Sequence, residues 1–148
     1  VFISSLIAFC IFSGFSDRDD QTLFIQNLLT KYYDSDVNRK DVKRFEINVT
    51  NNGFCRYKKF FNNGKQELFA FNLSHFKRMD YYGTAAKGEL YLRTKSDDVI
   101  VQTRNDRKGD IDSMANHIII PLKDIEVGEL NALSESLQKI NATLIAQK

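Results

Sequence analysis

Residues 45–73 read FEINVTNNGFCRYKKFFNNGKQELFAFNL and contain three apolar segments separated by two Asn-Asn-Gly triplets. In the first segment Phe45, Ile47 and Val49 alternate with polar residues, which is the period of a half-buried strand. Asn and Gly tolerate the positive φ angles of tight turns, so each triplet indicates a hairpin. The pattern predicts an antiparallel meander of three strands at 45–49, 54–61 and 66–73.

The segments that follow continue the pattern of short strands and turns. Leu90 and Leu92 alternate with Tyr91 and Arg93, for example, and the pair Asp97-Asp98 is typical of a turn. The region 105–116 is polar, and we expect it to be an excursion without regular structure. Four further strands are predicted, at 75–82, 89–94, 99–103 and 117–122.

Two segments show the helical period instead. Residues 19–33 carry an apolar stripe at spacings of three and four, and an aspartate at 19 or 20 can cap the first turn. Residues 126–146 carry a second stripe, which predicts a long amphipathic helix that covers a sheet or closes the end of a barrel. The leucine and isoleucine residues of this second stripe are Leu130, Leu133, Leu137, Ile140 and Leu144.

Seven strands in a meander followed by one amphipathic helix resemble the pleckstrin-homology (PH) superfold over residues 45–146. The resemblance implies an α+β fold, namely a seven-stranded antiparallel PH-like barrel or sandwich capped by a C-terminal helix. The N-terminal helix is an addition to that fold. Members of the superfold that bind phosphoinositides carry basic residues around the first hairpin, whereas many others bind peptides or proteins.

The first sixteen residues contain no charged side chain, and residues 1–12 are largely apolar. A membrane-spanning helix needs about 20 apolar residues, so the length of this apolar segment is more typical of a signal-peptide core. Small residues follow it, and cleavage is expected just before Asp17. We expect an exported protein, periplasmic or secreted, with an uncleaved anchor or a buried N-terminal element as alternatives. The expected division is 1–16 signal peptide, 17–41 helix and linker, and 42–148 β domain with C-terminal helix.

The chain has 148 residues, a formal net charge of +2 and two cysteines. Its length fits one domain with a sizeable core. Without residues 1–16 only Cys55 remains, so the domain is expected to fold without an internal disulfide.

Positive charge is concentrated in residues 31–78, which hold eleven basic and five acidic side chains. No nucleic-acid-binding motif accompanies this charge, so nucleic acid is not an expected partner.

Two groups of residues are candidates for binding, and the small-residue loop at 83–88 is expected to form part of the same ligand surface. Aromatic and basic residues gather after the third strand, and tyrosine and arginine are favoured at interface hot spots. We expect this first group to contact a protein partner: Phe76, Lys77, Arg78, Tyr81 and Tyr82. The second group follows the first hairpin turn and would contact an anion such as a lipid headgroup: Arg56, Lys58 and Lys59.

No catalytic or cofactor motif is recognised in the sequence. The nominal hydrolytic set of Ser74, His75 and Asp80 is not expected to converge, because adjacent strand residues point to opposite faces. The oxygen-rich segment 105–113 lacks the ligand order of a calcium loop. We therefore expect no enzymatic activity, no cofactor and no metal.

The expected function is that of an exported, non-enzymatic binding or accessory module of the cell envelope. A small-ligand or lipid-headgroup binder that uses the barrel mouth and the basic first hairpin is the alternative, and an enzyme is the third. Membrane contact is expected only where residues 1–16 are retained.

Overall fold

A computed structural model describes residues 13–147 of the chain. The expected signal peptide therefore lies mostly outside the described residues, and only its last four positions are included, as the start of the first helix. Between residues 13 and 147, no helix is long and apolar enough to cross a membrane.

The described chain consists of two α-helices, eight strands and one turn of 3₁₀ helix. The helical segments are α1 (Ser13–Tyr32), η1 (Leu73–His75) and α2 (Val127–Ala146). The strands are β1 (Val42–Val49), β2 (Phe54–Phe61), β3 (Gln66–Asn72), β4 (Phe76–Gly83), β5 (Lys87–Thr94), β6 (Val99–Arg104), β7 (Ile111–Ala115) and β8 (His117–Lys123). Helix α1 begins six residues before the predicted start.

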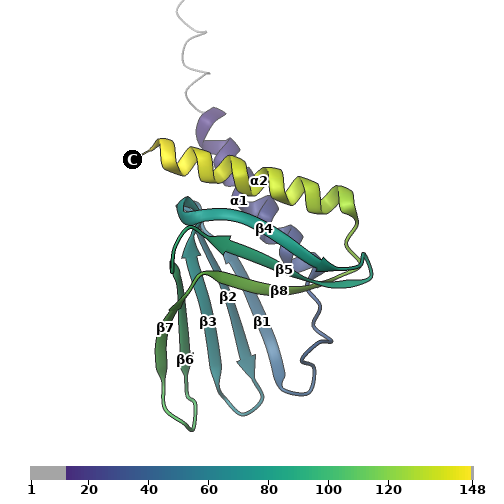
Figure 1. The fold of residues 1–148 in the computed structure, drawn as a ribbon, viewed down its shortest axis with the longest axis vertical. Helices are drawn as coiled ribbons and strands as arrows, with labels where there is room; N and C mark the ends of the chain where they lie inside the picture. The colour runs from purple at the N-terminus through teal and green to yellow at the C-terminus, as the bar shows by residue number, and fades with distance from the viewer. Residues whose placement is uncertain (1–12, 148) are drawn as a thin grey trace, which may run out of the picture.

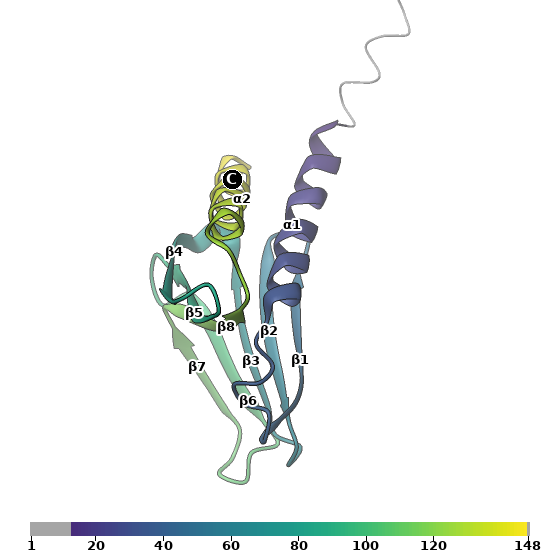
Figure 2. The same ribbon diagram turned by 90° about the vertical axis from the view of Figure 1, so that its right-hand side faces the viewer.

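The strands form two antiparallel sheets, with the orders β1-β2-β3-β6-β7 and β4-β5-β8. The α+β class and the three-stranded meander are confirmed, with Cys55 opposite both Val49 and Phe71. The sheets do not join into a closed barrel over residues 13–147. The three-stranded sheet crosses the upper part of the larger sheet, whose strands extend well beyond it (Figures 1 and 2).

The expectation of seven strands in one meander differs from the structure in two respects. An eighth strand, β7, occupies part of the segment expected to be irregular; four of its five residues are exposed, so no alternation of buried and polar residues marks it. The chain also leaves the first sheet after β3. There the Asn72 side chain accepts a hydrogen bond from the Ser74 N–H and caps η1, and β3 pairs with β6 instead of β4.

The core lies between the upper part of the larger sheet, the inner face of the smaller sheet and the two helices. The predicted stripe of α2 is buried from Leu133 to Leu144, and Leu130 packs at its edge. Helix α2 lies over β4, while α1 runs beside β1 (Figure 2). Because the helices cover only one side of the smaller sheet, its other face is left beside the projecting strands of the larger sheet.

Candidate functional site

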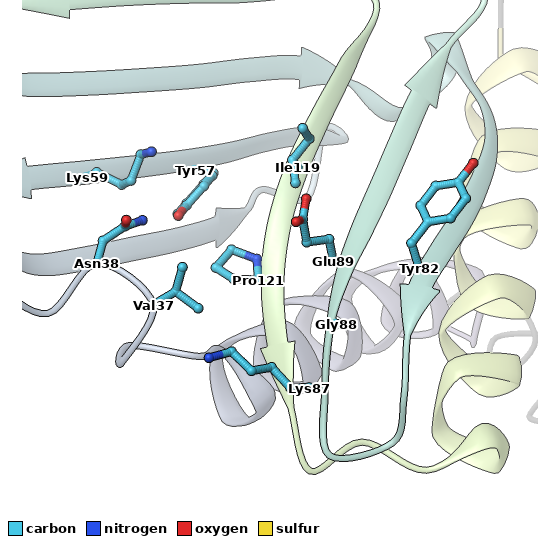
Figure 3. Close-up of a pocket in the computed structure, with 10 residues that line it drawn as sticks. All are labelled: Val37, Asn38, Tyr57, Lys59, Tyr82, Lys87, Gly88, Glu89, Ile119 and Pro121. Atoms are coloured by element: carbon cyan, nitrogen blue, oxygen red, sulfur yellow. The ribbon is translucent and has the colours of Figure 1, made fainter.

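A cleft of about 380 Å³ lies between the two sheets, on the side of the smaller sheet away from the helices (Figure 3). Its lining comes from three parts of the chain: the linker after α1, strand β2 of the larger sheet, and all three strands of the smaller sheet. The residues that line it are Val37, Asn38, Tyr57, Lys59, Tyr82, Lys87, Gly88, Glu89, Ile119 and Pro121.

One wall of the cleft is a row of cross-strand neighbours on the smaller sheet. Tyr82 lies opposite Glu89, and Glu89 lies opposite Pro121. Ile119 lies two residues along β8 and therefore on the same face. The intervening Ile120 faces the core and is fully buried, whereas the side chain of Ile119 is 38% exposed. Alternate side chains of the apolar strand β8 therefore face the core and the cleft.

The other wall is formed by Tyr57, whose hydroxyl oxygen lies 2.5 Å from that of Tyr33. Tyr33 comes directly after α1 and stacks on Phe45, with ring centroids 3.7 Å apart. Burial raises the pKa of both tyrosines above the ordinary value, so both hydroxyls are neutral at neutral pH. Figure 3 draws the Tyr57 oxygen on the side of Asn38 and Val37.

Each lysine of the cleft already faces a carboxylate. Lys59 Nζ lies 3.6 Å from Glu67 and within 6 Å of the ring centroids of Tyr57, Phe61 and Phe69. Such cation–π contacts favour a lysine in partly apolar surroundings. Lys87 Nζ lies 3.9 Å from a carboxylate oxygen of the buried Asp34. Together with Glu89, these pairs leave the cleft without an excess of positive charge.

No family model, no curated protein and no solved structure matches the chain.

The five residues expected to contact a protein partner do not form one surface. Phe76 is buried in the core beneath α2, while Lys77 and Arg78 are exposed. Tyr81 is half-buried and pairs with the core residue Leu90, so it faces the helices. Tyr82 is 56% exposed and is the member of this group that lines the cleft.

The three basic residues expected to bind an anion are also separated, because β2 is extended along its whole length. Arg56 and Lys58 face away from the cleft, where they lie over the rings of Phe54 and Phe60. Lys59 points to the opposite face and into the cleft. Of the eight candidate residues, the structure therefore brings Lys59 and Tyr82 to one place.

Most residues of the cleft lie outside the predicted binding groups, although Lys87 and Gly88 belong to the predicted loop at 83–88. Ile119 and Pro121 lie in a correctly predicted strand, but the sequence does not show which face of that strand is covered. Tyr57 has the signature of a core position, and it is 2% exposed at the cleft wall. The pairing of β5 with β8 would have located the site, and this pairing joins residues that are 24 to 36 positions apart in the sequence.

The nominal hydrolytic set is not assembled. His75 Nδ1 lies 3.4 Å from Asp98 on the surface, whereas Asp80 pairs with Arg78 and Arg93. The other histidine, His117, contacts the neighbouring Asn116 side chain. Within residues 13–147, no group of three or more histidine, cysteine or acidic side chains is placed to hold a metal ion.

Proposed function

We propose that this chain is a non-enzymatic binding module and that the cleft between its two sheets holds the ligand. The observation that carries the proposal is the concave, partly apolar lining formed by residues that the fold leaves exposed. Val37, Tyr82 and Ile119 are 44%, 56% and 38% exposed around one hollow. Binding pockets for small molecules typically measure about 300–1,000 Å³ and combine apolar walls with a few polar groups.

The proposal replaces the two surfaces expected from the sequence with a single one. It keeps a small ligand as the occupant, which is the alternative expectation, and moves the site from the barrel mouth and the basic first hairpin to the junction of the sheets. We also propose that the fold is PH-like. Two antiparallel sheets packed with a C-terminal helix support this likeness. The charge-free residues 1–16 support an address outside the cytosol.

The test uses N-phenyl-1-naphthylamine, a neutral apolar fluorophore whose emission rises in an apolar site. We expect saturable binding to the chain and a loss of affinity of about tenfold or more in Ile119→Glu. The substitution places a charge on the cleft wall, where an apolar probe would have to desolvate it. Ile119 is partly exposed and outside the core, so the fold should persist, which the near-UV circular dichroism spectrum checks.

Ile100→Glu is the matched control. Ile100 is also 38% exposed and lies in a central strand, but on the face of the larger sheet opposite to the cleft. Affinity for the fluorophore should stay within about twofold of the original chain. Equal affinities of the two variants would contradict the proposal, because the probe would then bind elsewhere.

A further inference from the structure

The Tyr33–Tyr57 pair has one more donor than the structure uses. Two phenolic hydroxyls carry two protons, and the single hydrogen bond between their oxygens engages one of them. No other acceptor contacts either hydroxyl among the residues that the structure describes. Tyr33 is 6% exposed and Tyr57 is 2% exposed, so the second proton belongs to a group that is nine-tenths buried. Each hydroxyl oxygen has the other as its partner, so neither is unpaired, but the second proton has no acceptor among the residues that the structure describes.

The cleft is the place where that proton can meet an acceptor. Tyr57 lines the cleft and Tyr33 does not. Either oxygen can act as the donor within the pair. When Tyr33 donates to Tyr57, the second proton is on Tyr57 and is available to a molecule in the cleft. An acceptor in the cleft would select this direction.

We propose that the ligand presents an oxygen acceptor, either a carbonyl or a carboxylate, to the Tyr57 hydroxyl and lays an apolar body against Ile119 and Pro121. The inference rests on the proposed function of the cleft and adds the chemistry that the ligand must carry. Tyr57 then acts as the specificity-determining donor, with Tyr33 behind it as its hydrogen-bond donor.

The charges around the cleft do not by themselves favour an anion. Lys59 and Lys87 each face a carboxylate within 4 Å, and Glu89 adds a negative group to the wall. A neutral carbonyl and a carboxylate therefore remain two sources of the same acceptor. Both are included as separate arms of the experiment.

The experiment uses three benzene derivatives of similar size, followed by ¹⁵N–¹H NMR titration of the whole chain. Toluene has no hydrogen-bonding group, acetophenone offers a neutral carbonyl, and benzoate offers a carboxylate. We expect acetophenone, benzoate or both to bind more tightly than toluene and to shift the Ile119 amide resonance. In Tyr57→Phe, the affinity for these acceptors should fall about three- to tenfold, the loss of one hydrogen bond.

The matched control is Tyr33→Phe, which removes the other hydroxyl of the pair and keeps both rings. The affinity for the acceptors should fall by less than in Tyr57→Phe, because Tyr57 retains its proton and loses only the hydrogen bond from Tyr33. Toluene is the internal control for folding, since its affinity should be the same in all three proteins. The arm that loses affinity in Tyr57→Phe identifies the source as a neutral carbonyl or a carboxylate.

Three results would overturn the inference. Acceptors that bind equally well to the original chain and to Tyr57→Phe would show that this hydroxyl makes no contact with them. An equal loss of acceptor affinity in Tyr33→Phe would show that Tyr57 is not the distinctive donor to the ligand. If none of the three compounds shifts the Ile119 resonance, the inference also fails. Toluene or fluorophore binding that persists while the variants behave alike would leave the proposed function standing without this refinement.

Discussion

The side-chain amide of Asn141 lies 2.8 Å from the backbone carbonyl oxygen of Leu73. The same Nδ2 atom is within 3.1 Å and 3.2 Å of the carbonyl oxygens of Ser74 and Phe76. These carbonyls belong to η1 and to the start of β4, where the chain passes from one sheet to the other. One side chain of α2 thus satisfies the backbone at the crossover, which ties the helix to the junction of the sheets.

Asn141→Ala should destabilise the fold by about 1–3 kcal/mol, since the part-buried carbonyls lose their shared donor. Urea denaturation followed by far-UV circular dichroism measures the change. Asn131→Ala is the matched control, because Asn131 is exposed on the same helix and the gain in helix propensity is the same. A free energy of unfolding equal in the two variants would refute the role of Asn141.

Gly53→Ala should destabilise more than Gly64→Ala, although both glycines end an Asn-Asn-Gly turn. The φ angles are +93° and +90°, so both substitutions carry the cost of a left-handed conformation, about 1–2 kcal/mol. A Cβ at Gly53 would lie 2.4 Å from Leu144 Cδ1, whereas a Cβ at Gly64 meets nothing within 4 Å. Displacing Leu144 should add about 1 kcal/mol to the loss in the free energy of unfolding, which urea denaturation measures. Equal losses of stability in the two variants would mean that Leu144 and the C-terminal end of α2 move aside without cost.

Cys55 should be inert to thiol reagents in the folded protein. Its side chain is fully buried in the core, and burial raises the pKa of the thiol to about 12. The reaction with 5,5′-dithiobis(2-nitrobenzoate) at pH 8 should therefore be slow until urea unfolds the chain. The measurement needs a Cys10→Ser background, so that Cys55 is the only cysteine. Rapid labelling without denaturant would contradict the buried position.

Because the pKa of the Cys55 thiol is raised, the free energy of unfolding should depend on pH. The unfolded thiol ionises near pH 9, whereas the folded thiol stays protonated to about pH 12. The contribution of Cys55 is complete below about pH 9 and is lost as the pH rises towards 12. Urea midpoints at pH 8 and 10 should fall further apart for the chain with Cys55 than for Cys55→Ala in the same background. An identical pH dependence would exclude this contribution.

Asp80 should titrate below the ordinary range of aspartate. Hydrogen bonds from Arg93 and then Arg78 lower its pKa, with Nε atoms 2.6 Å and 3.1 Å from the same carboxylate oxygen. The stabilisation is present above the unfolded pKa and is lost as the pH falls through the folded value. In ¹³C NMR titrations, Arg93→Gln should raise the pKa of Asp80 more than Arg78→Gln does. The opposite order would show that Arg78 is the main partner.

Elements with strong local signals were predicted well. Strand β2 begins and ends at the predicted residues, because an Asn-Asn-Gly turn stands on each side of it. The α2 stripe from Leu133 to Leu144 is buried as expected, since four apolar residues at spacings of three and four share one face of the helix. In both cases the decisive interactions lie within a few residues along the chain.

The features that the sequence did not reveal depend on distant partners. β7 is an exposed edge strand, and its pairing with β6 rather than its own residues makes it a strand. The cleft requires that β8 pair with β5 and that β2 project past both. Lys58 and Lys59 are adjacent in sequence and lie on opposite faces, so a basic cluster along an extended strand does not become a basic surface.

The chain passes between the two sheets three times, because the β6–β7 hairpin of the larger sheet is inserted between β5 and β8 of the smaller one. Neither sheet is therefore a contiguous segment that could be excised as an independent folding unit. During folding the β1–β3 hairpins can close early over short loops, whereas β8 must wait for the intervening hairpin to cross. We expect refolding to be limited by this late closure, so the cleft, which needs β8, should be among the last parts of the molecule to form.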